Sequence, residues 1–148
     1  MECSKSCAAM LRKCQVGGLT QLSTAGGGFS VGGDARCLVE KCKLMYISGG
    51  PDGKQGKGAA VFAMGNGKVS AEQSTLQDCA YCFVIYDHPR VIVRSCKLTA
   101  SSVAFEAHEG TENAALLLQK TQVRCQRVWS TSVRPGRFET RDCDIVAC

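Results

Sequence analysis

The sequence predicts an all-β repeat protein in which short parallel strands stack as a solenoid. One six-residue pattern occurs six times, at residues 11–16, 39–44, 71–76, 93–98, 118–123 and 140–145. Its first residue is apolar or small, its fourth is Cys, Ser or Thr in every copy, and its sixth is apolar. The 16 glycines and three prolines divide the 148 residues into short segments, which favours strands and turns over long helices.

We call the fourth residue of this pattern the key position. It falls at Cys14, Cys42, Ser74, Cys96, Thr121 and Cys143, at intervals of 28, 32, 22, 25 and 22 residues. The base period is 22 residues, and the longer intervals hold insertions. The largest is the glycine-rich segment 49–58, and an extra turn occupies 109–112. Because insertions in repeat proteins lie in loops, we expect the core positions to keep their register.

Further columns appear when the insertions are set aside and the coils are aligned on the key position. The columns thirteen, eleven, five and three residues before it, and two after it, are mostly apolar. A spacing of two is the period of a strand with one buried face, so each coil should contribute two or three short strands within 11–148, after a small cap over 1–10. The predicted columns include Phe29, Val61, Phe83, Phe105 and Ser130 at thirteen before, and Cys37, Val69, Val91, Leu116 and Phe138 at five before.

The coil resembles the repeat of the right-handed parallel β-helix, the fold of pectate-lyase-like proteins. The likeness rests on the order apolar, any, apolar, any, any, small, any, apolar within a 22-residue coil, and it covers 28–148 better than 11–27. In that family the small inward position is often Asn, whereas this chain has Cys, Ser or Thr. The resemblance implies about six 22-residue coils around one continuous core. A leucine-rich repeat is the alternative, but its spacing of Leu and Asn is missing.

The same resemblance implies a member without catalytic activity. Polysaccharide-cleaving relatives use paired aspartates, or calcium-binding acidic clusters with an essential Arg or Lys, and neither pattern occurs here. The alternative is an acid–base cluster of Asp87, His88, His108 and Glu109 in two successive turns. A CxxC spacing at 79–82 has no second such pair beside it. We therefore expect no enzyme activity, no cofactor and no metal site.

Composition and charge limit the cellular location and the class of partner that we expect for the protein. No apolar run approaches the ~18 residues of a membrane span, and residues 1–10 lack the apolar core of a secretory signal. The 11 cysteines are odd in number and many lie on the repeat, which indicates reduced structural thiols in an intracellular, cytoplasmic protein. A net charge of +5 without dense Lys or Arg tracts, and with one Trp and three Tyr, disfavours nucleic acid as the partner.

Two outward-facing sets of residues are the candidate binding sites. Six residues before the key position stands a basic column, broken only by Ala115. Stacked cations repel one another, so we expect an acidic partner to stabilise this column. Alternate residues of the first strand form an outer apolar strip, which would be unusual on a free monomer and suggests either a docking surface or cover by another segment. The basic column is Arg36, Lys68, Arg90 and Arg137, and the outer apolar strip is Phe62, Met64, Tyr86 and Trp129.

These features predict a non-catalytic module for protein binding or scaffolding within a larger assembly. The basic column and the outer apolar strip are the surfaces expected to hold the partner. Self-association is a second route to assembly, because the uncapped ends of a β-helix expose strand edges that recruit other strands. The alternative function is a carbohydrate-active or carbohydrate-binding protein of the pectate-lyase-like class, which the fold alone favours.

Overall fold

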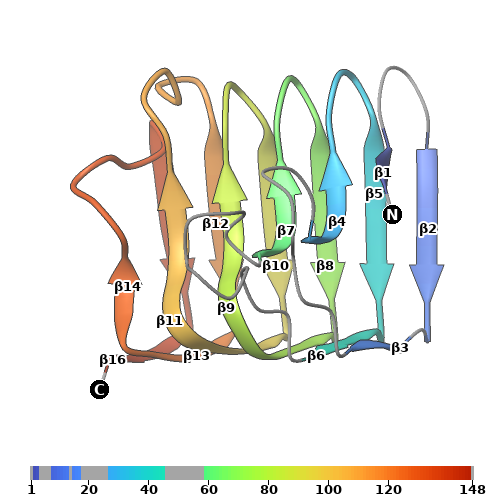
Figure 1. Ribbon diagram of the computed structural model, residues 1–148, viewed down its shortest axis with the longest axis vertical. Helices are drawn as coiled ribbons and strands as arrows, with labels where there is room; N and C mark the ends of the chain where they lie inside the picture. Colours follow the sequence, from blue (N-terminus) through green and yellow to red (C-terminus); the bar gives the residue numbers. More distant parts are fainter. Residues whose placement is uncertain (1, 4–7, 14, 18–26, 46–58, 148) are drawn as a thin grey trace, which may run out of the picture.

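The computed structural model describes residues 2–3, 8–13, 15–17, 27–45 and 59–147, with side chains described within 8–13, 30–45 and 59–147. Within these ranges all regular secondary structure is β-strand. The strands pair in parallel and stack as a β-solenoid (Figure 1). This confirms the predicted all-β solenoid, and its coils average about 23 residues where the sequence predicted 22. None of the described residues belongs to a helix long and apolar enough to cross a membrane.

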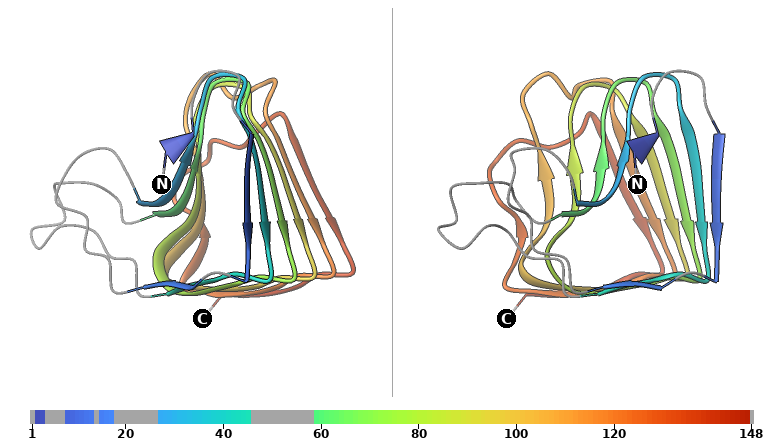
Figure 2. Two further views of the ribbon diagram at one scale, coloured as in Figure 1. Left: turned by 90° about the vertical axis from the view of Figure 1, so that its right-hand side faces the viewer. Right: turned by 45° about the vertical axis from the view of Figure 1, so that its right-hand side comes forward.

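Two parallel sheets form the walls of the solenoid. The six-stranded sheet has the order β15-β12-β10-β8-β5-β2, so each coil adds one strand. Its strands are β2 (Ala8–Arg12), β5 (Arg36–Glu40), β8 (Lys68–Glu72), β10 (Arg90–Arg94), β12 (Ala115–Gln119) and β15 (Arg137–Arg141). The ten-stranded sheet forms the other sides of the coil, as the end-on view shows (Figure 2, left). Its strands are β1 (Glu2–Cys3), β3 (Gln15–Gly17), β4 (Gly27–Val31), β6 (Lys43–Met45), β7 (Ala59–Ala63), β9 (Thr75–Ile85), β11 (Lys97–Ala107), β13 (Gln122–Cys125), β14 (Arg127–Trp129) and β16 (Asp144–Ala147).

The register of the six-stranded sheet confirms the alignment predicted from the repeat. Successive neighbours along one column are Arg36, Lys68, Arg90, Ala115 and Arg137. The 32- and 25-residue coils keep this register, as expected. The glycine-rich segment 49–58 and the key position of the first coil lie outside the described residues. Strand β2 pairs in register with β5 from residue 8 onward, within the segment expected to be a cap.

The core consists of inward columns that run along the stack. Phe83 and Phe105 are neighbours in register, both are fully buried, and their ring centroids lie 6.2 Å apart. Leu44, Leu76 and Leu98 form a second such column on the adjoining side. Burying one side chain of this size contributes about 1.5–3 kcal/mol. Because each coil supplies only one residue to a column, the core exists only when the coils are stacked.

The key position marks a sharp bend in the coil. In the fourth coil Ser95, the residue before it, has a left-handed backbone with a φ of 52°. The Cys96 thiol then donates a hydrogen bond to the carbonyl oxygen of Arg94, 3.2 Å from Sγ. The hydroxyls of Ser74 and Thr121 donate in the same way to the carbonyl two residues earlier, at 2.9 Å. A small side chain with a donor therefore fits this bend, which explains the choice of Cys, Ser or Thr.

Candidate binding face of the six-stranded sheet

The outer face of the six-stranded sheet carries three columns of side chains, spaced two residues apart along each strand. Residues between them, such as Cys37 and Val39, point into the core and are buried. The first is the basic column. The second, which we call the central column, is Met10, Leu38, Ser70, Ile92, Leu117 and Glu139. The third, the mixed column, is Arg12, Glu40, Glu72, Arg94, Gln119 and Arg141.

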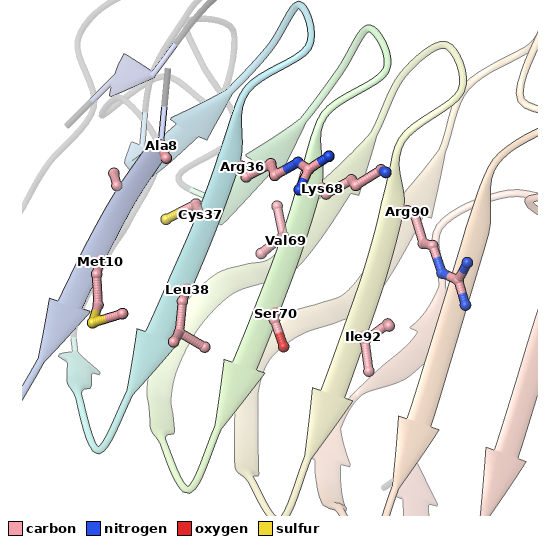
Figure 3. Close-up of a pocket in the computed structure, with 11 residues that line it drawn as sticks. Ala8, Met10, Arg36, Cys37, Leu38, Lys68, Val69, Ser70, Arg90 and Ile92 are labelled. Atoms are coloured by element: carbon pink, nitrogen blue, oxygen red, sulfur yellow. The ribbon is translucent and has the colours of Figure 1, made fainter. Parts of the chain in front are cut away.

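A hollow of about 580 Å³ lies over β2, β5, β8 and β10 on this face (Figure 3). The central column forms its floor, where the small side chain of Ser70 sits between Leu38 and Ile92. The basic side chains Arg36, Lys68 and Arg90 line one edge of the hollow. A second hollow, of about 160 Å³, lies over β10, β12 and β15 and shares Ile92 with the first. The face therefore combines an apolar depression with a positively charged edge.

Three cations of the basic column have no carboxylate partner among the residues that the structure describes. Within the described part of the chain, Arg36, Lys68 and Arg90 form no ion pair, and all three are exposed. In the mixed column, by contrast, Arg94 lies 3.5 Å from a carboxylate oxygen of Glu72. Strands in a parallel sheet are about 4.8 Å apart, and two unit charges at that distance in water repel by on the order of 1 kcal/mol. The edge of the hollow is therefore a row of uncompensated positive charge.

Arg137, the fourth residue of the predicted basic column, differs from the other three. Its Nε lies 2.8 Å from Oε1 of Glu139 on the same strand. The hydrogen bond from Arg137 lowers the pKa of Glu139, and the same bond raises the pKa of Arg137. Ala115 also separates Arg137 from Arg90 in the column. The structure thus divides the predicted column into three unpaired cations at the hollow and one paired cation beyond it.

Sequence reasoning missed the central column. Its residues stand four before the key position, where five of the six coils have Met, Leu, Ile or Ser. This apolar column is visible in the aligned coils, but the charged residues on the same side of the strand predict a purely polar surface. Leu38, Ile92 and Leu117 are half-buried and Met10 is 62% exposed, so these side chains offer apolar surface next to the cations.

The outer apolar strip is not the open docking surface that the sequence predicted as one of two alternatives. Phe62 is only 4% exposed and packs with the buried side chains of Ala59 and Val84 in a second cluster. Met64 and Tyr86 are partly buried against this cluster, and burial raises the pKa of Tyr86. Phe62 thus agrees with the covered alternative, and large side chains on successive coils contribute to its burial. The rings of Phe62 and Tyr86, for example, stack with centroids 6.5 Å apart.

Trp129 also lies elsewhere than predicted. The structure pairs Trp129 with Phe105, in the inward column where the sequence alignment placed Ser130. A shift of one residue moves a side chain to the other face of a strand, so Trp129 packs against the core instead of facing outward. Its ring lies 5.1 Å from that of Phe138 and 5.4 Å from that of Phe105. The guanidinium of Arg134 covers the ring at 4.6 Å.

The histidine that was considered for acid–base chemistry has a buried carboxylate beside it. Nε2 of His108 lies 2.7 Å from Oε1 of Glu106, whose side chain is 5% exposed. The His108 ring stacks on Tyr86 with centroids 4.0 Å apart. Asp87, another member of the proposed cluster, accepts a hydrogen bond from the Gly65 amide at 3.0 Å. The pair of Glu106 and His108 thus ends the aromatic stack of the ten-stranded sheet, away from the hollow.

The cysteines whose side chains the structure describes are free thiols. Both cysteines of the CxxC spacing, Cys79 and Cys82, are fully buried, and burial raises the pKa of Cys82 well above 9.0. Such a thiol is protonated at neutral pH and is a poor nucleophile or metal ligand. Among the described residues, no group of three or more His, Cys, Asp or Glu side chains is placed to hold a metal ion.

Comparison of the chain with protein-family models, with curated proteins and with solved structures gives no match. What the protein binds must therefore be inferred from its own surfaces. The outer face of the six-stranded sheet is the strongest of these, because it joins a hollow, partly exposed apolar side chains and charges unpaired among the described residues in one place.

Proposed function

We propose that this protein is a non-catalytic β-solenoid module that binds an acidic protein partner within a larger assembly. In this proposal it is a non-catalytic relative of the pectate-lyase-like β-helix proteins. The partner would lie on the outer face of the six-stranded sheet. The observation that carries the proposal is the row of Arg36, Lys68 and Arg90, unpaired among the described residues, along the edge of an apolar hollow.

Both the basic column and the apolar side chains of this face favour a protein partner. Carboxylates of a partner would relieve the repulsion within the basic column, and opposite charges across an interface also speed association. Covering Leu38, Ile92 and Leu117 would remove apolar surface from water, at about 25 cal/mol per Å². A polar edge around an apolar centre is the usual arrangement of a protein interface.

The carbohydrate alternative receives less support from the same hollow. Cleavage of a glycosidic bond commonly requires two carboxyl groups on either side of the bond. The described side chains that line the large hollow include neither a carboxylate nor an aromatic ring. Enzymatic cleavage at this face is therefore the poorer explanation of its chemistry.

Affinity capture from a cell lysate of the source tests the proposed function. The bait proteins are the wild-type chain, the variant Arg36→Glu/Lys68→Glu/Arg90→Glu, and the matched control Lys43→Glu/Lys97→Glu/Lys120→Glu, which makes the same charge change away from the hollow. We expect acidic proteins that bind the wild type and the control but are lost with the first variant. If all three bait proteins capture the same set of proteins, this face does not bind the partner and the proposal is wrong.

Self-association is a second mode of assembly that we propose. Within the described residues, β2 and β15 are the outer strands of the six-stranded sheet, and each pairs with a neighbour on one side only. Unpaired strand edges are templates for further strands. Stacking through these edges would extend the columns of one chain into those of the next and would leave the outer face accessible.

A further inference from the structure

We propose that the partner presents an amphipathic α-helix with one acidic flank, and that this helix lies along the solenoid axis over the central column. This inference rests on the proposed function, since it specifies the partner of the same face. It follows from three features of the face: the hydrogen bonding of its strands, the spacing of its cations and the position of its hollow.

The first feature is that the inner strands of the face offer a partner no backbone hydrogen bonds. Strands β5, β8, β10 and β12 each pair with a neighbour on both sides. An extended peptide is usually recognised by adding a strand to an exposed sheet edge, and of the four strands beneath the hollow only β2 has such an edge within the described residues. A helix satisfies its own backbone groups and can dock through side chains alone. These strands, which are paired on both sides, therefore favour a helix over an extended segment as the occupant.

The second feature is the spacing of the cations along the axis. Arg36, Lys68 and Arg90 occupy three successive strands, so Arg36 and Arg90 lie about 9.6 Å apart at the backbone. Acidic residues at positions i, i+4 and i+7 of a helix span about 10.5 Å along its axis. Three alternate residues of an extended peptide span about 13 Å. The span of the helical acidic residues differs from that of the basic column by about 1 Å, whereas the span of the extended peptide differs by about 3 Å or more.

The third feature is the width and depth of the site. The basic and mixed columns are separated by four residues along the strands, or about 13 Å. A helix with its side chains is about 10–12 Å in diameter and fits between them over the central column. Ser70 leaves a gap between Leu38 and Ile92, into which one large apolar side chain of the helix would insert. The hollow would thus receive a knob from the helix.

Charge fixes which flank of the helix is acidic. The mixed column contains both signs, and Arg12 and Arg94 in it are paired with Glu40 and Glu72. The flank over that column would therefore carry neutral polar residues. The flank over the basic column would carry the carboxylates, because the cations there have no partner among the described residues.

Binding of three designed peptides of about 18 residues, measured by fluorescence anisotropy, tests this inference. The first is a covalently bridged helix with Leu at the apolar stripe and Glu at i, i+4 and i+7 of one flank. The second has the same residues in alternating Glu–Leu order, which favours an extended strand. The third is the bridged helix with Gln in place of Glu. We expect the first peptide to bind the wild-type chain at least about tenfold more tightly than the other two.

Variants of the protein separate charge from shape. Arg36→Glu/Lys68→Glu/Arg90→Glu should abolish binding of the acidic helix, whereas Lys43→Glu/Lys97→Glu/Lys120→Glu should change it less than about twofold. Ser70→Tyr fills the gap without changing the net charge and should weaken binding by about fivefold or more, with an unchanged circular dichroism spectrum. Equal or tighter binding of the alternating peptide, insensitivity to Ser70→Tyr, or no binding of the acidic helix at millimolar concentration would overturn the helix proposal. Face-dependent capture from the lysate would still support the proposed function in each of these cases.

Discussion

At the scale of single residues, the key position shows how one side chain turns the coil. The left-handed residue before it costs roughly 1–2 kcal/mol for a residue other than glycine. At the bend the carbonyl oxygen of Arg94 accepts a hydrogen bond from the Gln73 amide at 3.0 Å, and the key side chain adds a donor within reach of it. The Cys96 thiol lies 3.2 Å from Arg94 O in its own coil and 3.4 Å from Ala71 O in the preceding coil. This double contact, which Cys42 and Ser74 also make, links the bend to the coil before it.

The first prediction concerns the identity of the donor at this bend. Cys96→Ser keeps a donor, as Ser74 and Thr121 do in the same column, whereas Cys96→Ala removes the side-chain donor beside the carbonyl oxygens of Ala71 and Arg94 and leaves Arg94 O with the Gln73 amide alone. We expect Cys96→Ala to lower the free energy of unfolding by about 1–3 kcal/mol and Cys96→Ser to lower it less. Urea unfolding followed by circular dichroism measures both values.

Cys82 is the control for this prediction, because no described acceptor lies within hydrogen-bond distance of its buried thiol. A hydroxyl at that site would be unsatisfied, so Cys82→Ser should be more destabilising than Cys82→Ala. The order of Ser and Ala is thus expected to reverse between positions 96 and 82. The same order at both positions would show that the thiol of Cys96 acts only by its size.

The second prediction concerns stability at high pH. Burial raises the pKa of Cys82 well above 9.0 in the folded state, while the unfolded thiol ionises near 9.0. Above that pH the unfolded chain releases a proton that the folded chain retains, so the stabilisation present below pH 9.0 is lost as the pH rises. We expect the urea midpoint to fall between about pH 8 and pH 10, by less in Cys82→Ala than in the wild type. An identical pH dependence in both proteins would contradict this assignment.

At the scale of strands, the repeat predicts most of the register because each inward column must continue through the stack. The columns of Val61, Phe83 and Phe105, and of Val69, Val91 and Leu116, agree with the pairing in the structure. A residue of the wrong polarity in such a column would be buried or would break the core. That constraint fixes register wherever one face of a strand is apolar.

The last coil shows where this constraint is not sufficient. Trp129 and Phe83 occupy the same column, but Trp129 stands 8 residues before Arg137 whereas Phe83 stands 7 before Arg90. Trp129 correspondingly stands one residue closer than Phe83 does to the key position that precedes it, so the coil keeps its length of 22 residues. Because the two changes cancel, the total period does not reveal the shift. Only the bulk of Trp at an inward position indicates it.

The third prediction distinguishes the two registers. Trp129 packs between Phe105 and Phe138, so Trp129→Ala should lower the free energy of unfolding by about 3 kcal/mol or more. The Ser130 hydroxyl is buried without a hydrogen-bond partner among the described residues, so Ser130→Ala should be neutral or stabilising by up to about 1 kcal/mol. Urea unfolding measures both. The opposite ranking would support the register predicted from the sequence alone.

At the scale of the whole molecule, the sequence predicts the stack more readily than the binding face. Stacking depends on residues that repeat, and the basic column was predicted because like charges recur at one position. The shape of the hollow depends on an exception, the small Ser70 among larger residues of the central column. Its charge depends on which ion pairs form, because they leave three cations without a carboxylate partner among the described residues. Which carboxylate pairs with which cation is decided by side-chain geometry across strands. The repeat does not encode that geometry.

The fourth prediction concerns the distribution of stability along the solenoid. Each coil is held chiefly by its neighbours, so an inner strand opens only when contacts on both sides are lost. Strands β8 and β10 have neighbours on both sides, whereas β15 has one and is largely exposed. We expect backbone amides of β8 and β10 to exchange most slowly with deuterium and those of β15 to exchange fastest. Hydrogen exchange with mass spectrometry at low micromolar concentration measures this gradient.

The concentration dependence of the same exchange separates the two proposed modes of assembly. If chains associate through their strand edges, protection in β15 should rise with protein concentration, because its free edge becomes paired, while β8 and β10 remain unchanged. Adding the acidic helical peptide should stabilise the chain as a whole without pairing that edge, so its effect should reach β8 and β10 as well. Equal protection in all strands at every concentration would mean that the solenoid opens as one cooperative unit, and stability would then not be a sum of coils.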